Sequence, residues 1–289
     1  MLRFKQWLGV ASTVFCVASA QAETSVWQLT NGEQHLYIAG TVHLLPPEQF
    51  PLPDEFATAY QAAAVLAFET DIRELETAEG MQLLMQHARY QDGRSLNNVL
   101  SAATYQQLAQ FAKSQGVDLA PLNSFKPDFV MLTLMQVALQ KAGMAGEGVD
   151  SHFLQRAIAD AKPLLFLETV EQQLSMLLNI SDTNENVFVQ QNLEQLSELE
   201  AQLTEIISAW RAGNIASLSK LAMAFTDTPQ GQQFYDILLV QRNKSWLPQI
   251  EKMLATPEVE LVLVGALHLA GENNLLQLLQ QKGYKLTQL

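Results

Sequence analysis

Residues 36–44 read LYIAGTVHL and residues 261–269 read LVLVGALHL, so one pattern occurs near each end of the chain. In both segments an apolar run, typical of a buried β-strand, leads into Gly-x-x-His. The glycine permits a tight turn where the chain leaves a sheet. A single histidine after a strand is more often structural, but two of only five histidines, His43 and His268, repeat this arrangement. The repetition predicts a site built from both.

Two further apolar runs end on carboxylates. Residues 65–68 precede Glu69, and residues 164–167 precede Glu168. Sites in open α/β sheets form beyond the carboxyl ends of the strands, so these side chains can converge with the two histidines. Two neutral imidazoles with one or two carboxylates suit Zn, Mn, Co or Fe, and an open coordination position makes a bound water nucleophilic near neutral pH. The pattern predicts hydrolytic chemistry.

The rest of the chain predicts an α/β fold with a central, mainly parallel sheet and large helical insertions. Strand patterns occur at residues 26–29, 35–39, 65–68, 164–167, 259–264 and 283–286. Helical patterns occur at residues 54–63, 74–140, 151–161 and 171–254. The first two strands flank a hairpin turn, and the next helix and strand form a crossover unit.

The second long helical block, residues 171–254, is rich in Gln, Glu and Leu, as coiled coils are. Gly213 and Pro229 interrupt it, and heptads are not sustained, so a helical subdomain is the better interpretation. The helices at 184–208 can pack within one chain or between chains, because both arrangements bury one apolar stripe. The sequence therefore leaves the oligomeric state open.

The first 22 residues predict a signal peptide. Arg3 and Lys5 precede an apolar run from Trp7 to Ala18, and Ala20-Gln21-Ala22 supplies the small residues at which signal peptidase cleaves. The run is shorter than the roughly 20 residues that span a bilayer, so an uncleaved anchor is the weaker alternative. We therefore expect an exported, most simply periplasmic, mature chain with no stable membrane anchor.

Composition limits the chemistry of this mature chain. Its predicted form contains no cysteine, because Cys16 lies in the signal, so any metal must be held by His, Asp or Glu. The formal net charge of −13 disfavours nucleic acids and anionic headgroups as ligands. Divalent cations and neutral or cationic peptides remain compatible ligands. A simpler explanation accounts for most of the negative charge: it keeps an exported protein soluble.

Three more residues are candidates whose roles depend on context. Asp150 can cap the helix that follows it or join the site, and His152 can be a metal ligand, a partner of a ligand or a buried polar residue. Arg242 can hold Glu69 or Glu168 ionised, or stabilise an oxyanion, or form an ion pair on a helix surface.

The order and spacing of these motifs resemble the TraB/GumN family, which is related to the Tiki metalloproteases. The resemblance covers nearly all of the mature chain, residues 23–289, as one domain. It rests on LYIAGTVHL at 36–44, FE at 68–69, GVDSHF at 148–153, KP at 162–163, LET at 167–169 with EQ at 171–172, WRAG at 210–213, Arg242-Asn243 with Trp246, and GALHL at 265–269 with Gly271.

This resemblance implies two β/α halves around a central sheet, each contributing one Gly-x-x-His, and a divalent-metal site, with Mn or Co favoured and Zn possible. We predict no residues that bind any other cofactor. On this chain it implies metal ligands at His43, Glu69 and His268, and catalytic roles for Glu69 and Arg242. It assigns no definite role to three further candidates, which can contact the metal ligands or hold a second metal. These are Asp150, His152 and Glu168.

The expected function is thus an exported metal-dependent hydrolase, peptidase-like, acting on a peptide or protein. The resemblance leaves the substrate open, because some relatives are linked to peptide-pheromone control and others to haem or iron handling. The alternative is a periplasmic binding protein that holds a peptide, haem or metal without turnover. A structural, chaperone-like module whose histidines satisfy buried polar groups is a third reading, which metal bound through both histidines would eliminate.

Overall fold

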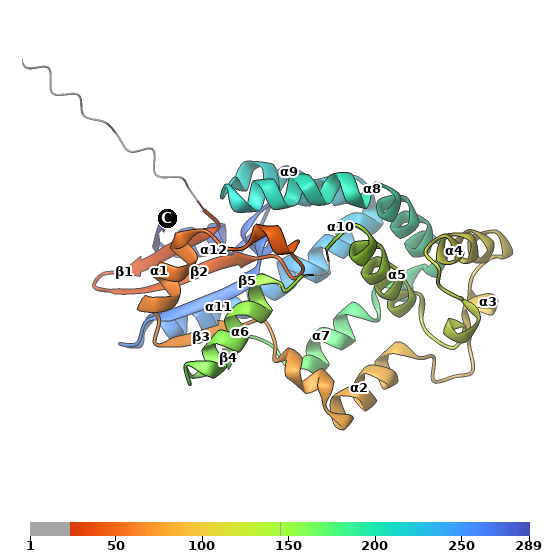
Figure 1. Cartoon of the computed structure of the whole chain (residues 1–289), viewed down its shortest axis with the longest axis horizontal. Helices are drawn as coiled ribbons and strands as arrows, with labels where there is room; N and C mark the ends of the chain where they lie inside the picture. Colours follow the sequence, from red (N-terminus) through yellow and green to blue (C-terminus); the bar gives the residue numbers. More distant parts are fainter. Residues whose placement is uncertain (1–23, 145) are drawn as a thin grey trace, which may run out of the picture.

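The computed structural model describes residues 24–144 and 146–289. In Figure 1 the sheet lies on the left, and a lobe of helices extends to the right. The predicted signal peptide, residues 1–22, falls outside the described residues and stays a prediction. Among the described residues, none of the helices combines the length and the apolar character that crossing a membrane requires.

The strands that the sequence pattern predicts are all present, with ends that differ by two residues at most. The strands are β1 Val26–Asn31, β2 Gln34–Thr41, β3 Val65–Phe68, β4 Leu164–Phe166, β5 Glu260–Gly265 and β6 Lys285–Gln288. The α-helices are α1 Asp54–Ala62, α2 Ala78–Ala88, α3 Leu96–Val99, α4 Ala102–Ser114, α5 Pro127–Lys141, α6 Val149–Ala159, α7 Val170–Leu177, α8 Glu185–Arg211, α9 Ile215–Met223, α10 Pro229–Tyr235, α11 Gln241–Leu254 and α12 Leu275–Gln281.

The six strands form one sheet in the order β4-β3-β5-β2-β1-β6. The four strands from β4 to β2 are parallel, and β1 is antiparallel to both β2 and β6. The sheet is therefore mainly parallel, as predicted, with an antiparallel edge. Because parallel strands point the same way, the carboxyl ends of β4, β3, β5 and β2 lie along one edge of the sheet. The implied division into two β/α halves stays a prediction.

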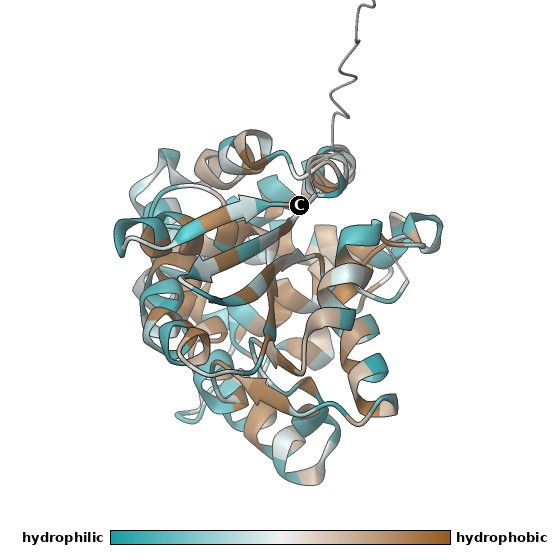
Figure 2. Ribbon diagram, turned by 90° about the vertical axis from the view of Figure 1, so that its left-hand side faces the viewer, coloured by the Kyte–Doolittle hydropathy of each residue, from teal (hydrophilic) through white to brown (hydrophobic). Residues whose placement is uncertain are grey.

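Side chains that alternate along the strands build a core on each face of the sheet. On β5, Leu261 and Leu263 pack in a core with residues of α1 and α6. Val262 and Val264 pack in a second core with residues of α11 and α12. Figure 2 shows apolar residues along the central strands. The sheet is thus covered on both faces, which explains why β5 is a continuous apolar run rather than an alternating one.

Two long helical segments separate the parallel strands, as predicted. Helices α2 to α6 lie between β3 and β4, and α7 to α11 lie between β4 and β5. Parts of both segments share a third core that includes Leu96, Leu108, Leu134 and Val189. Helix α8 packs against α4, α5 and α9 of the same chain. This intrachain packing supports a helical subdomain over a coiled coil.

The end of α8 is fastened to the strand that leads to His43. The Trp210 indole donates a hydrogen bond to the Gly40 carbonyl, with an Nε1 to O distance of 2.7 Å. The Ser25 hydroxyl donates to the Trp210 carbonyl at 2.6 Å. Both contacts are buried, so they satisfy polar groups that water cannot reach. They position the first Gly-x-x-His relative to the helical lobe.

Gly148 allows α6 to approach the same segment closely. The Val149 N–H donates to the Val42 carbonyl at 3.0 Å. A Cβ atom on Gly148 would lie only 2.1 Å from the His43 carbonyl oxygen and 2.8 Å from the His43 Cα. Those contacts are with backbone atoms, which cannot rotate away. The absence of a side chain therefore brings the start of α6, including Asp150, beside His43.

We expect Gly148→Ala to lower the free energy of unfolding by about 3 kcal/mol, because its methyl group overlaps rigid backbone. Gly116→Ala is the control. A Cβ there meets open space, and only its backbone φ of 74° disfavours alanine, at a cost of about 1–2 kcal/mol. Urea denaturation measures both, and a loss for Gly148→Ala no larger than that for Gly116→Ala would contradict the argument.

Candidate functional site

Four neighbouring strands deliver chemically active side chains to one edge of the sheet. In sheet order, β4, β3, β5 and β2 lead to Glu168, Glu69, His268 and His43. A cavity of about 570 Å³ lies at this edge, and all of these side chains except Glu168 line it. Arg242 of α11 lines it as well. Residues that are far apart in the sequence therefore share one site.

The Arg242 guanidinium lies among these groups and is nearly buried, with 11% of its side chain exposed. Nη2 donates to Glu69 at 2.5 Å and to Glu168 at 2.6 Å, and Nε donates to Glu168 at 3.1 Å. Nη1 donates to the Leu238 carbonyl at 3.2 Å and to His268 Nε2 at 3.0 Å. These acceptors engage all the N–H groups of the guanidinium. Arg242 is thus a buried bridge and not an ion pair on a helix surface.

A π-helical turn, Asp236–Val240, directly precedes α11. Within this turn the Leu238 carbonyl accepts a hydrogen bond from the Arg242 side chain. Such turns interrupt the regular α-helical bonding pattern and are frequent at functional sites. Farther along α11, the Trp246 ring lies under the guanidinium, with 4.5 Å from the Arg242 Cζ to the ring centroid. Together these contacts fix the direction of Arg242.

His268 is held in one tautomer by Asn243. The Asn243 amide nitrogen donates to the Asn273 carbonyl at 3.1 Å, so its amide oxygen faces His268 Nδ1, at 2.7 Å. Nδ1 therefore carries the proton, and Nε2 carries the lone pair that Arg242 approaches. Burial, together with the charge of Arg242, lowers the pKa of His268 to about 3 despite the opposing effect of Glu69. The imidazole is neutral at physiological pH.

Glu69 is held in its ionised form. Burial raises its pKa, but the attraction of Arg242, with smaller contributions from His268, His43 and the Gly265 N–H, outweighs burial and lowers the pKa to about 2. Glu69 Oε1 accepts the Gly265 N–H at 2.7 Å, and Oε2 accepts from Arg242. The carboxylate is therefore oriented from two sides.

His43 forms a second oriented imidazole with Asp150 and Thr41. Its Nδ1 lies 2.8 Å from Asp150 Oδ2, and the Thr41 hydroxyl donates to Asp150 Oδ1 at 2.7 Å. Asp150 does not cap α6, because Gly148 occupies the N-cap position. The attraction of Asp150 raises the pKa of His43 to about 9, although 69% of the His43 side chain is exposed and solvent screens this attraction. Asp150 therefore favours the protonated ring.

The two histidines and Glu69 surround Gly265. A Cβ atom built on Gly265 would lie 3.4 Å from Glu69 Oε1, 3.6 Å from His43 Nε2 and 3.7 Å from His268 Cδ2. These are ordinary van der Waals distances, and the φ of Gly265 is −51°, so neither space nor backbone conformation requires glycine here. The distances do show that the three groups converge on the point where β5 ends.

These donor types fit a divalent cation. Both Nδ1 atoms are held by side-chain oxygens, which is how metal-binding histidines are commonly oriented. With neutral imidazoles, Glu69, Glu168, Asp150 and Arg242 carry formal charges that sum to −2, which one divalent cation would balance. Within the described residues, however, no group of three or more His, Cys, Asp or Glu is arranged to hold a metal ion. Arg242 occupies the lone pair of His268 Nε2.

His152 lies apart from this constellation. It is not among the residues that line the cavity. Its Nδ1 is 3.6 Å from Glu147, and its ring packs against Phe50 with 5.2 Å between the centroids. Thr41 and Asn243 were not predicted to have a role, yet Thr41 donates to Asp150 and Asn243 contacts His268. The sequence gives only one indication of each: Thr41 lies two residues before His43, and Asn243 directly follows Arg242.

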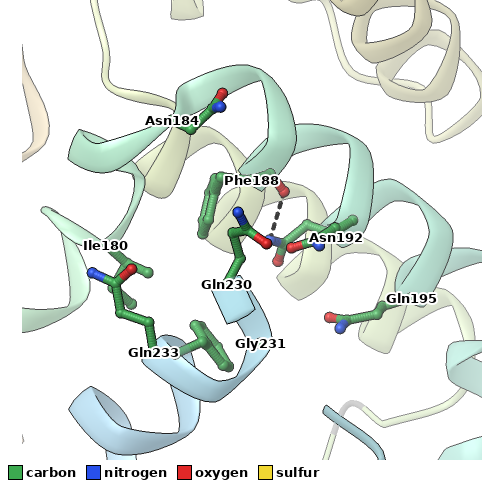
Figure 3. Close-up of a pocket in the computed structure, with 10 residues that line it drawn as sticks. Ile180, Asn184, Phe188, Asn192, Gln195, Gln230, Gly231 and Gln233 are labelled. Atoms are coloured by element: carbon green, nitrogen blue, oxygen red, sulfur yellow. Dashed lines mark hydrogen bonds between the residues drawn. The ribbon is translucent and has the colours of Figure 1, made fainter. Parts of the chain in front are cut away.

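A second, much smaller pocket lies between α8 and α10 (Figure 3). It holds about 40 Å³ and contains none of the predicted site residues. Of the described residues that line it, none is charged; they include Phe188, Asn192, Gln230 and Gln233. Asn192 donates to the Phe188 carbonyl at 2.9 Å. The smaller pocket therefore has none of the charged groups that line the larger cavity.

Comparison with known proteins identifies relatives over nearly the whole described chain. A sequence model of the TraB/PrgY/gumN family matches residues 25–288. Two proteins with the name "uncharacterized protein YbaP", from Escherichia coli strain K12 and Shigella flexneri, are each 27% identical to this chain over 251 residues. The matched region covers 86% of this chain and 89% of each relative. No solved structure matches the chain.

We expect Arg242→Met to lower the free energy of unfolding by about 3–5 kcal/mol, because it leaves two buried carboxylates without a counter-charge. Adding Glu168→Gln to this variant should recover part of the loss, since it removes one of the two charges. Urea denaturation at neutral pH measures both effects.

The control is Arg94→Met, which removes an arginine that is half exposed and paired with Asp92 at 2.8 Å. That pair should contribute less than about 1 kcal/mol. If Arg242→Met cost no more than Arg94→Met, the buried bridge would not stabilise the fold.

Proposed function

The chain belongs to the TraB/PrgY/gumN family, and we propose that it is an exported, divalent-cation-dependent hydrolase that cleaves peptides. One observation carries the proposal: both imidazoles of the site have Nδ1 held by a side-chain oxygen, from Asp150 for His43 and from Asn243 for His268. Each Nε2 then lies on the side of Glu69, as the contacts around Gly265 and the 3.7 Å from His268 to Glu69 indicate.

His43, His268 and Glu69 would hold the cation. A divalent cation there supplies Lewis acidity, which lowers the pKa of a water molecule and polarises a carbonyl group. Mn²⁺ or Co²⁺ is favoured by the family resemblance, and Zn²⁺ suits the same donors. Asp150 and Asn243 keep the two rings in the required tautomer. Glu168 keeps Arg242 in place.

Arg242 has a role that follows from its hydrogen bonds. All its N–H groups have acceptors, and one Nη1–H is used on His268 Nε2. If His268 held a cation through that lone pair, this N–H would be free. A free guanidinium N–H at this position can donate to the oxygen that gains negative charge when a peptide carbonyl is attacked. Glu69, ionised because of Arg242, can accept the proton of the attacking water.

Export to the periplasm is part of the proposal and rests on the predicted signal peptide, residues 1–22. A second function, a binding protein without turnover, is favoured by one observation. The cavity lining is mainly apolar, with polar groups at one end. Such a cavity can hold a ligand whether or not the polar groups react.

We expect residues 23–289, freed of metal with a chelator, to bind Mn²⁺, Co²⁺ or Zn²⁺, measured by calorimetric titration. His43→Ala and His268→Ala should each weaken binding by at least about tenfold, since each removes one of three donors. His87→Ala is the control, because His87 lies in α2 and does not line the cavity. Circular dichroism checks that each variant is folded.

The same protein should cleave internally quenched peptides when the cation is restored and stop when chelator is added. Binding without cleavage would favour the binding protein. Chelator-resistant cleavage that rises between pH 7 and pH 9 would contradict the cation-dependent route. It would indicate that His43 itself is the base, because Asp150 raises its pKa to about 9 and only the deprotonated ring accepts a proton.

A further inference from the structure

The site cavity is lined by more apolar than polar surface; besides the charged residues and histidines, its polar side chains are Thr41, Thr70, Ser151 and Gln173. Seven leucine and isoleucine side chains line it. They are Ile72 from the short 3-10 helix Ile72–Glu76, Leu154 from α6, Leu177 from α7, Ile206 from α8, Leu238 and Leu239 from the π-turn, and Leu267 from the 3-10 helix Ala266–Leu269. Both helical insertions therefore contribute to one apolar wall. Its volume of about 570 Å³ lies within the range of cavities that enclose a small ligand.

Ile72 shows that this wall is not covered within the chain. Its exposed fraction is 43%, which makes it one of the few large apolar side chains exposed to that extent in the described part of the protein. Covering such a side chain with an apolar group is favourable, whereas covering it with a charged group is not. The wall therefore favours an apolar occupant.

The cations at the polar end are already paired. Arg242 is bound by Glu69 and Glu168, and His43 is bound by Asp150. No lysine and no other arginine is among the described residues that line the cavity. A free carboxylate brought into it would lie near Glu69 and Asp150 without a positive partner of its own, which is costly in a partly buried place. The cavity therefore disfavours the carboxyl terminus of a peptide and acidic side chains.

Resting on the proposed hydrolase function, we propose that the cavity binds an apolar stretch of a peptide at a point away from its carboxyl terminus. The amide to be cleaved lies at His43 and Glu69, and an adjacent apolar side chain packs against Leu177, Leu238 and Leu239. The reaction consumes one water. Its oxygen bonds to the carbonyl carbon, the C–N bond breaks, and the two protons of the water end on the new carboxyl group and the new amine.

Peptide binding in the presence of a chelator tests this assignment without turnover. The probes are three fluorescein-labelled hexapeptides: Gly-Gly-Leu-Val-Phe-Leu as the amide, the same peptide with a free carboxylate, and the amide with Leu and Phe replaced by Glu. Fluorescence anisotropy measures their affinities for residues 23–289. We expect the apolar amide to bind at least about tenfold more tightly than either charged form.

A matched pair of variants locates the binding. Ile72→Asp should weaken binding of the apolar amide by about tenfold, because it places a charge on the wall. Ile158→Asp is the control: Ile158 is exposed to a similar extent, 48%, but lies on α6 outside the cavity lining. Both positions are exposed, so both variants should fold, and circular dichroism checks this.

The outcomes separate this inference from the proposed function. Equal affinity for the three probes, or an equal effect of the two variants, would overturn the inference. Tight binding of the apolar amide without cleavage after a cation is added would support the inference and refute the hydrolase. Cleavage of the Glu-containing peptide as readily as the apolar one would support the hydrolase and refute the inference.

Discussion

The buried Arg242 guanidinium is the contact on which the arrangement of the site depends. It comes from α11, in the second helical insertion, and its partners follow three different parallel strands. Glu69 and Glu168 would repel each other at this depth without a shared positive charge. The cation therefore joins the sheet edge to a helix and makes a cluster of carboxylates compatible with burial. The same bridge occupies the lone pair of His268 Nε2, so in the proposed hydrolase the stability of the fold and cation binding would compete for one side chain.

Much of the fold could be predicted because its signals are local. Apolar runs of strand length, followed by a glycine or a carboxylate, located the strands to within two residues and placed His43, Glu69, Glu168 and His268 at strand ends. The repeat of Gly-x-x-His indicated that two of these ends belong together. The strand order was not predicted, because the sequence of a single strand does not specify which strands pair with it.

The remaining parts of the site depend on contacts across the fold. Whether Asp150 caps a helix or joins the site could not be predicted, because the answer depends on the close approach of Gly148 to the backbone of His43. Likewise the role of Arg242 depends on a π-turn that periodicity does not reveal. Asn243 fixes the tautomer of His268 from a different element, α11, so the sequence around His268 does not indicate this contact.

The sheet order also has a consequence for the order of events as the chain is made. Strand β5 comes late in the sequence yet lies between β2 and β3, which come early. His43 and Glu69 therefore lie at the ends of strands that are joined by a third strand, and this strand begins at Glu260 and is synthesised long after both of them. A nascent chain that has not yet reached β5 has neither the second imidazole nor the scaffold that aligns the first. The site therefore stays incomplete until synthesis has passed residue 268.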